Sequence, residues 1–286
     1  MNYYNNFDLT EACRLVKMAL KEDIGKGDIT TDNLIPAKNI STAQILLKED
    51  GIISGLKIFK LVFDSLSKDI KIKFRVAEGA FLKKGTVIGE VKGSTRILLK
   101  GERTALNILQ RMSGISTITN SFIQKLNNSK IRILDTRKTT PNFRLFEKLA
   151  VKIGGGTNHR IGLYDMMLIK DNHIEANGGI EKTLDRLSSI EKKFKIEIEV
   201  KNLFELMIVS TLGKGIVDIV MLDNFKINEI EEAVKIVKGI FKLEISGGIN
   251  LDTISKYSKI KGIDFISVGA VTHSAKSLDI SLDFIN

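Results

Sequence analysis

Short apolar segments alternate with amphipathic segments from about residue 125 onward, and this alternation constrains the fold more than any other feature. The apolar segments are IRILDTR, DMMLIKDNH, FKIEIEV, VDIVMLDN, LEISGGI and FISVGAV. Helical periodicity marks the segments between them, such as IEKTLDRLSSIEKKF, LFELMIVSTLGKG, INEIEEAVKIVKG and LDTISKYSKIKG. Strands that alternate with helices of this length form a parallel sheet. Six or seven such units, without the GxGxxG fingerprint of dinucleotide-binding folds, favour a closed or nearly closed (β/α) barrel.

The beginning of the chain has a different pattern. Asp8 and Glu11 form a capping box, which predicts an amphipathic helix immediately after Asp8. Residues 41–92 contain short strand-like runs separated by glycines, and a helix is expected around residues 102–112.

These patterns divide the chain into two expected domains. The first is an N-terminal domain of residues 1–112, and the second is a barrel domain of residues 113–271. The C-terminal segment 272–286 is a candidate addition to the first domain.

The composition excludes several classes of protein. The chain has 44 Lys and Arg against 34 Asp and Glu, a formal charge of +10. It has no Trp, 6% aromatic residues and no compact basic block, which argues against nucleic acid as the partner. No apolar stretch approaches the ~20 residues of a membrane span and no secretory signal is visible, so we expect a cytoplasmic protein. The single Cys13 excludes an internal disulfide and lies on an apolar helix stripe.

Polar residues follow the predicted barrel strands with regularity. They are Asp135 to Thr140, Gly154 to Arg160, Lys170 to His173, Glu197, Glu199, Asp223, Asn224, Ser246 to Gly248, Gly269 and Ala270. The chemistry of a (β/α) barrel takes place at the carboxyl ends of its strands. A charged residue after one strand is usually a solvated loop residue, but a succession of such strand ends indicates a pocket.

Glycine-rich turns follow the last two strands, in ISGGI and VGAV. Glycine lets the backbone approach a phosphate oxygen closely, and barrels commonly bind phosphate after their final strands. We therefore predict a phosphate site that consists of Ser246, Gly247, Gly248, Gly269 and Ala270.

Basic residues would crowd the same mouth of the barrel: Arg103, Arg137, Lys138, Arg160 and Lys170. Such a cluster repels itself unless an anion of high charge binds there, and arginine suits carboxylate and phosphate groups. Glu199 and Asp223 supply oxygen ligands of the kind that Mg²⁺ shares with substrate phosphates. The residues thus predict a phosphorylated polyanion and a carboxylated partner as substrates.

Several runs, in order over nearly the whole chain, carry a family resemblance: GERTALNILQRMSGIST, ILDTRKTTP, GGGTNHRIGLYDMMLIKDNHI, IEIEV, DIVMLDN, SGGI and SVGAVTHS. They resemble the quinolinate phosphoribosyltransferases, also called nicotinate-nucleotide pyrophosphorylases (carboxylating). The resemblance implies the type II phosphoribosyltransferase fold, an N-terminal α/β open-sandwich domain and a C-terminal incomplete (β/α) barrel. It implies that quinolinate and 5-phosphoribosyl 1-diphosphate become nicotinate mononucleotide, pyrophosphate and CO₂ in NAD synthesis, with Mg²⁺ as cofactor.

The resemblance also assigns roles to individual residues. It implies a homodimer or homohexamer in which Arg103, the arginine of ERTALN, enters the neighbouring site. The other implied substrate-binding residues are Thr136, Arg137, Lys138, His159, Arg160, Lys170, Glu199 and Asp223. Of these, Lys138, Lys170, Glu199 and Asp223 would also act in catalysis, and the two acidic residues would lie near the metal. One departure is EVKN after the acidic strand, where a more acidic run is expected.

The implied reaction explains these residue types. Transfer at the anomeric carbon passes through an oxocarbenium-like state, so positioning and stabilisation of the leaving pyrophosphate are the main tasks. The pyridine nitrogen is the nucleophile, and once alkylated the ring becomes an electron sink that favours loss of CO₂. Lys138 or Lys170 could stabilise or protonate the resulting carbanion. His159 is a third candidate, and the alternative for this histidine is to orient a loop by hydrogen bonds. We expect His173 and His273 to be structural.

Three other interpretations stay open from the residues alone. A sister phosphoribosyltransferase could act on another base, although Arg103, Arg137 and Arg160 favour a dicarboxylate. A basic binding module could hold RNA and would show steep salt dependence. A carrier domain could be modified near Lys83, since VAEGAFLKKGTVIGEVKG looks like half of a lipoyl- or biotinyl-type sandwich.

Overall fold

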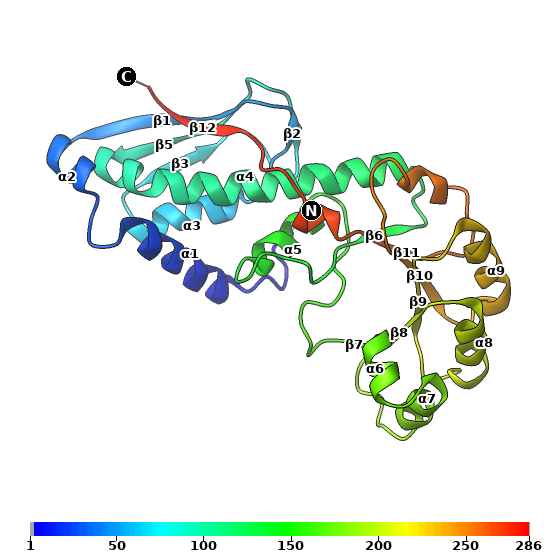
Figure 1. Ribbon diagram of the computed structural model, residues 1–286. Helices are drawn as coiled ribbons and strands as arrows, with labels where there is room; N and C mark the ends of the chain where they lie inside the picture. Colours follow the sequence, from blue (N-terminus) through cyan, green and yellow to red (C-terminus); the bar gives the residue numbers. More distant parts are fainter. Residues whose placement is uncertain (1–2, 286) are drawn as a thin grey trace. The chain divides into compact units, whose positions relative to one another are not determined.

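The computed structural model describes residues 3–285, which form two compact units (Figure 1). The first unit comprises the described parts of Met1–Asn120, Thr139–Gly155 and Val271–Asn286, and the second comprises Ser121–Lys138 and Gly156–Ala270. The domain boundaries expected from the sequence stay a prediction.

The first unit contains an antiparallel sheet and several helices. Its strands are β1 (Ile40–Leu47), β2 (Gly51–Ile52), β3 (Lys71–Phe74), β4 (Phe81–Leu82), β5 (Val87–Ser94) and β12 (Ile280–Ile285). Its helices are α1 (Leu9–Ile24), α2 (Ile29–Leu34), α3 (Leu56–Leu66), α5 (Arg144–Ile153), most of α4 (Thr95–Leu126) and most of α10 (Ala270–His273). The sheet has the order β12-β1-β5-β3, and β2 pairs with β4. Because β12 lies beside β1, segments near the two ends of the chain share one sheet (Figure 1).

Local sequence accounts for the helix boundaries in this unit. The Asp8 side chain accepts a hydrogen bond from the Glu11 N–H over 2.9 Å, so the predicted capped helix is confirmed as α1. The helix expected at residues 102–112 lies inside α4, which is longer at both ends. α4 includes Gly101, and glycine fits this position because a Cβ there would lie 2.7 Å from the Phe63 ring. This helical glycine therefore permits close packing and does not end the helix.

The second unit contains the parallel sheet. Its strands are β6 (Arg132–Leu134), β7 (Met167–Ile169), β8 (Ile196–Val200), β9 (Ile219–Asp223), β10 (Lys242–Ser246) and β11 (Phe265–Ser267). Its helices are α6 (Asp171–Ala176), α7 (Ile180–Ser188), α8 (Leu203–Leu212), α9 (Ile227–Val237) and a 3₁₀ turn, Ile254–Tyr257. Figure 1 shows α7, α8 and α9 along one side of the strands.

The order of this sheet is β6-β11-β10-β9-β8-β7, and every neighbouring pair is parallel. From β7 to β11, successive strands are neighbours, and β11, the last strand, pairs with β6, the first. The ring lacks only a pairing of β6 with β7 among the described residues, so the expected incomplete barrel is confirmed.

One predicted helix of this unit is nearly absent. Residues 251–262 contain only the short 3₁₀ turn. The Asn250 side chain accepts hydrogen bonds from the main-chain N–H groups of Asp252 and Thr253, a local turn that competes with an α-helix.

Alternation along the strands places polar residues inside the barrel. All five residues of β8 are buried, with Glu197 and Glu199 on one face and the apolar residues on the other. Strands of a parallel sheet that is covered on both faces are buried throughout. None of the described helices is long and apolar enough to cross a membrane.

Candidate active site

A cavity of about 320 Å³ lies at the carboxyl ends of the barrel strands. It is lined by Thr136, Arg137, Lys138, His159, Arg160, Leu168, Lys170, Met221, Ser246 and Ser267. All of these belong to the second unit. The structure therefore brings together most of the polar side chains that the sequence singled out.

Asp135 ties two of the lining loops together. Its fully buried carboxylate follows β6 and accepts hydrogen bonds from Asn158 Nδ2 over 2.6 Å and from the His159 N–H over 2.8 Å. Thr136 Oγ1 accepts a hydrogen bond from the Lys138 N–H over 3.1 Å. These bonds hold the loop with Arg137 and Lys138 against the loop with His159 and Arg160.

Arg160 lies close to a second arginine, Arg137. Its pKa lies below the ordinary arginine value because of burial and the nearby Arg137, while Glu197 and Asp165 act in the opposite direction. Two guanidinium groups close together in a partly buried cavity repel each other. An anion with more than one charge relieves this repulsion.

Lys170 and Glu199 form an ion pair at the ends of neighbouring strands. Lys170 Nζ lies 3.2 Å from Glu199 Oε2, and the lysine side chain is half exposed whereas the glutamate is buried. His173 Nδ1 accepts the Lys170 N–H over 2.9 Å, so this histidine stabilises the start of α6. His273 makes a local contact with Ser274, with 2.6 Å between Nδ1 and Oγ.

The predicted acidic and glycine-rich strand ends are adjacent. Asp223 on β9 pairs in register with Ser246 on β10, and Gly247 and Gly248 follow. Asp223 Oδ2 accepts a hydrogen bond from Asn224 Nδ2 over 2.8 Å. Glycine is needed at 247, where φ is 100° and a Cβ would collide with the Asn224 side chain.

The remaining predicted residues lie outside the cavity lining. Glu199 and Asp223 stand beside lining residues, at the carboxyl ends of β8 and β9. Gly269 and Ala270 directly follow β11. Arg103 lies exposed on α4 in the first unit.

Glu244 and Ser267 are part of the site although the sequence patterns do not point to them, and Glu197 is expected only as a polar residue of a strand, without a role. Glu197 and Glu244 are fully buried, and burial raises the pKa of both carboxyl groups. The charge of Glu197 raises the pKa of Glu244 further, whereas Arg160 and a hydrogen bond with Glu244 lower the pKa of Glu197 and Glu199 raises it. The signal in the sequence is a glutamate flanked by isoleucine or leucine inside a buried strand, in IEIEV and LEIS. An acid at such a position needs a partner inside the barrel.

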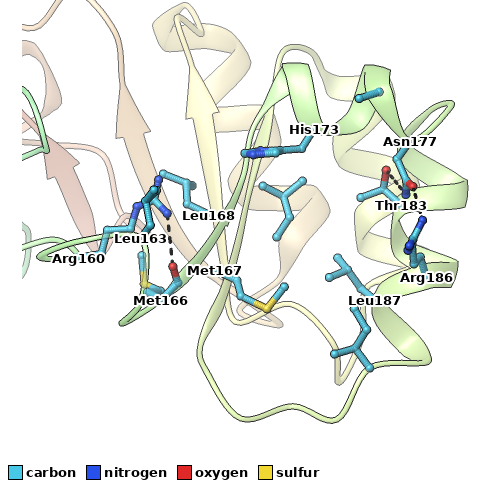
Figure 2. A pocket seen from close by; sticks show the side chains of 13 residues that line it. Arg160, Leu163, Met166, Met167, Leu168, His173, Asn177, Thr183, Arg186 and Leu187 are labelled. Carbon is cyan, nitrogen blue, oxygen red and sulfur yellow. Dashed lines mark hydrogen bonds between the residues drawn. The ribbon is translucent and has the colours of Figure 1, made fainter.

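A second cavity, of about 460 Å³, has a different character. It lies between β7 and the helices α6 and α7, and Figure 2 shows Leu163, Met166, Met167 and Leu187 among its lining side chains. Arg160 reaches its edge and donates from Nη1 to the Met166 carbonyl oxygen over 3.4 Å (Figure 2). The mostly apolar lining does not suit an anion, so the smaller polar cavity is the candidate active site.

Comparisons with known proteins agree with this geometry. The model of the quinolinate phosphoribosyl transferase C-terminal domain matches residues 115–283, and that of the N-terminal domain matches residues 28–113. A quinolinate phosphoribosyltransferase [decarboxylating] from Nicotiana glauca is 38% identical over 285 residues, covering 94% of this chain and 81% of the relative. A probable nicotinate-nucleotide pyrophosphorylase [carboxylating] from Bacillus subtilis is 39% identical over 94% of this chain and 92% of its own.

A solved structure has the same fold. The crystal structure of NadC from Streptococcus pyogenes superimposes with a TM-score of 0.92 at 36% identity, covering 99% of this chain and 100% of that one. Both domain models match in order, and together they span most of the chain. The chain therefore belongs to the quinolinate phosphoribosyltransferase family.

Proposed function

We propose that this protein transfers the phosphoribosyl group of 5-phosphoribosyl 1-diphosphate to quinolinate, releasing pyrophosphate and CO₂ and forming nicotinate mononucleotide. The observation that carries the proposal is the convergence of Arg137, Lys138, Arg160 and Lys170 on one cavity beside Ser246. Relatives named for this reaction align with nearly the whole chain. The product would serve NAD synthesis.

The two arginines are the proposed quinolinate ligands. A guanidinium binds a carboxylate through two parallel hydrogen bonds, and quinolinate carries two adjacent carboxylates. Arg137 and Arg160 come from loops that Asp135 ties together, so their spacing is set before substrate arrives. A single carboxylate would leave part of their mutual repulsion in place.

The end of β10 and the turn that follows it, Ser246 to Gly248, are the proposed site for the 5-phosphate. Gly247 has φ 100° and Gly248 has φ 59°, backbone conformations that suit glycine. The main chain at these positions can approach a phosphate closely because no side chain intervenes. Gly269 and Ala270, after the next strand of the sheet, are proposed to complete the site.

Glu199 and Asp223 fit a Mg²⁺ ion by the chemistry of their donor atoms. Both carry carboxylate oxygens at the ends of adjacent strands, and Mg²⁺ usually binds one or two carboxylates together with substrate phosphates. Mg²⁺ bound there would supply positive charge for the leaving pyrophosphate. Asn224 orients the Asp223 carboxylate, and Lys170 holds that of Glu199.

The cavity residues can serve both chemical steps. They position the pyridine nitrogen against the anomeric carbon, and Lys138 and Lys170 stabilise the developing negative charge on the leaving group. The second step leaves a carbanion that takes up a proton. Both ring nitrogens of His159 are occupied, by the Arg160 N–H and by Glu197, so Lys138 or Lys170 is the proposed proton donor.

We further propose a cytoplasmic homodimer or homohexamer in which Arg103 completes the site of a second copy. Arg103 is exposed on α4, so its guanidinium is accessible to another molecule. Cys13 is a free thiol, which suits a reducing compartment.

An assay of CO₂ release from quinolinate and 5-phosphoribosyl 1-diphosphate tests the proposed reaction. We expect turnover with both substrates present, and loss of turnover when Mg²⁺ is chelated. Turnover with nicotinate or another base, but none with quinolinate, would favour a sister enzyme. A carrier role is tested by the intact mass, since Lys83 pairs with Asp50 at 2.8 Å and no added mass is expected there.

A further inference from the structure

His159 and Ser267 line the candidate cavity, and Glu197 and Glu244 are buried beside them. None of these four polar side chains has a part in the reaction as described above. His159 Nε2 lies 2.9 Å from Glu197 Oε2 and 3.7 Å from Glu244 Oε2. Ser267 Oγ donates a short hydrogen bond to Glu244 Oε1. Glu197 and Glu244 are fully buried, and the His159 side chain is 7% exposed. Burying such a cluster lowers the stability of the fold unless its polar groups are hydrogen-bonded to one another. Polar groups that are kept in a barrel interior despite this cost indicate a role.

The cluster forms only because the sheet curls. Glu197 lies on β8 and Glu244 on β10, with β9 between them. Strands two apart are separated by roughly 9–10 Å in a flat sheet, beyond the reach of one hydrogen bond. His159 reaches both carboxyl groups from the loop after α5, so the three groups meet in the concave interior.

The hydrogen bonds determine the tautomer of His159. The Arg160 main-chain N–H lies 2.8 Å from His159 Nδ1 and can only donate, so Nδ1 must offer its lone pair. The neutral ring then carries its proton on Nε2 and donates it to Glu197 Oε2. The same ring therefore contacts the buried acids on one side and the main chain of Arg160 on the other.

We propose that Glu197, Glu244 and Ser267 are positioning residues that hold His159 in its Nε2–H tautomer and thereby fix the Arg160 main chain and aim its guanidinium into the cavity. The assignment of Arg160 to quinolinate rests on the proposed function. Ser267 orients Glu244 by its hydrogen bond. Side-chain oxygens of Glu244 and Glu197 lie within 4.8 Å of each other and of a ring nitrogen of His159, so Glu244 keeps the carboxyl group of Glu197 directed at the histidine ring. We expect the loss of any of these three side chains to weaken substrate binding through Arg160. None of the hydrogen bonds described here reaches a reacting atom.

A cation among His159, Glu197 and Glu244 is the competing explanation, since their ligand atoms lie within 4.8 Å of one another. A metal bound to Nε2 would replace the proton on that nitrogen. The two explanations therefore differ in one observable, the protonation of Nε2.

Nitrogen NMR of protein labelled with ¹⁵N-histidine measures this directly. The chain has three histidines, and the His173→Gln and His273→Gln variants assign the signal of His159. We expect His159 at neutral pH to show a protonated Nε2 and an unprotonated Nδ1. A protonated Nδ1, a doubly protonated ring, or a metal-bound Nε2 without a proton would overturn the proposal.

A pair of variants at Glu197 tests the effect on binding. Glu197→Leu removes the acceptor for Nε2–H, and we expect the KM for quinolinate to rise about 10- to 100-fold with a much smaller change in kcat. Glu197→Gln keeps an amide oxygen at the same place and should recover most of the lost affinity and the parental tautomer. An unchanged KM in Glu197→Leu, or equal KM values in the two variants, would contradict the positioning role.

Ser267→Ala is the milder variant if Glu197→Leu does not fold. It removes the donor to Glu244, and we expect KM to rise about 3- to 10-fold. Ser54→Ala is the matched control, because Ser54 is a buried serine of the first unit whose Oγ has no hydrogen bond among the described residues. Ser267→Ala with the same KM as Ser54→Ala would contradict the proposal. Absence of CO₂ release by the parent protein would overturn the proposed function instead, while the NMR result would still decide the tautomer.

Discussion

Asn224 Nδ2 donates a hydrogen bond to Oδ2 of the preceding residue, Asp223, over 2.8 Å, and its main chain adopts a left-handed φ of 57°. The Asn224 side chain also occupies the space that a Cβ of Gly247 would need. The LDN and SGG motifs of neighbouring strands therefore form one unit at the candidate site. The asparagine orients the carboxylate, and the glycine leaves room for the asparagine.

Asn224→Gly is compatible with the left-handed backbone and removes the side chain that donates a hydrogen bond to Asp223. We expect the KM for 5-phosphoribosyl 1-diphosphate to rise about 10-fold, because a supporting partner of a ligand carboxylate is lost. Steady-state kinetics at several Mg²⁺ concentrations measure this. Asn127→Gly, at a left-handed position with φ 48° after α4, is the control and should have parental kinetics.

Gly247→Ala places a methyl group against the Asn224 side chain in a backbone conformation with φ 100°. We expect a loss of about 1–3 kcal/mol in unfolding free energy and at least about 10-fold in activity. Thermal unfolding and the CO₂ assay measure the two effects. Gly239→Ala has φ 77° but open space around its Cβ, so its activity should be unchanged. Equal losses in both variants would show that backbone strain alone is responsible.

Arg137→Ala should abolish turnover of quinolinate while the protein stays folded. Two charge-assisted hydrogen bonds contribute about 3–6 kcal/mol together, so kcat/KM should fall at least about 100-fold. Arg132→Ala is the matched control, since Arg132 is an exposed arginine at the start of β6. Near-normal activity of Arg137→Ala would show that our placement of the site is wrong.

Mixing two inactive variants tests whether Arg103 acts across subunits. Arg103→Ala and Lys138→Ala would each be inactive alone. A mixed dimer would contain one site with both residues intact, so random mixing should restore roughly a quarter of parental activity. The CO₂ assay after co-refolding or co-expression measures this. Activity that stays at the level of the separate variants would place Arg103 in its own subunit's site or outside any site.

Glu244→Gln should alter the pH dependence of stability. Burial, with the like charge of Glu197 beside it, raises the pKa of Glu244 from 4.5 to about 8 in the folded protein. A raised folded pKa stabilises the protein at pH below 4.5, and this contribution is lost as the pH rises through about 8. Glutamine does not titrate, so the Tm of Glu244→Gln relative to the parent should increase between pH 5 and pH 9, by about 2 °C or more. A Tm difference that is constant over this range would contradict the assignment.

Local patterns predicted the elements of the barrel well. All six apolar segments overlap a strand of the parallel sheet, and the capping box at Asp8 begins α1. The failures were also local in origin. Asn250 forms a turn where a helix was expected at 251–262, and Gly101 is tolerated inside α4 because it packs against Phe63. Neither side-chain contact can be read from periodicity.

The side chains at the carboxyl ends of the strands can be predicted from the sequence, because two-residue alternation and strand ends are properties of neighbouring residues. Arg137, Lys170 and Ser246 are found in this way, and the structure places all three around one cavity. Arg160 is also expected after a strand, which is wrong, because it lies in the loop after the helix α5 and lines the cavity from there. The contact of Glu197 and Glu244, on strands that do not pair, with the ring of His159 is visible only in the three-dimensional fold. Such a contact depends on strand order and on the curvature of the sheet, which bring distant residues together only when the whole barrel has formed.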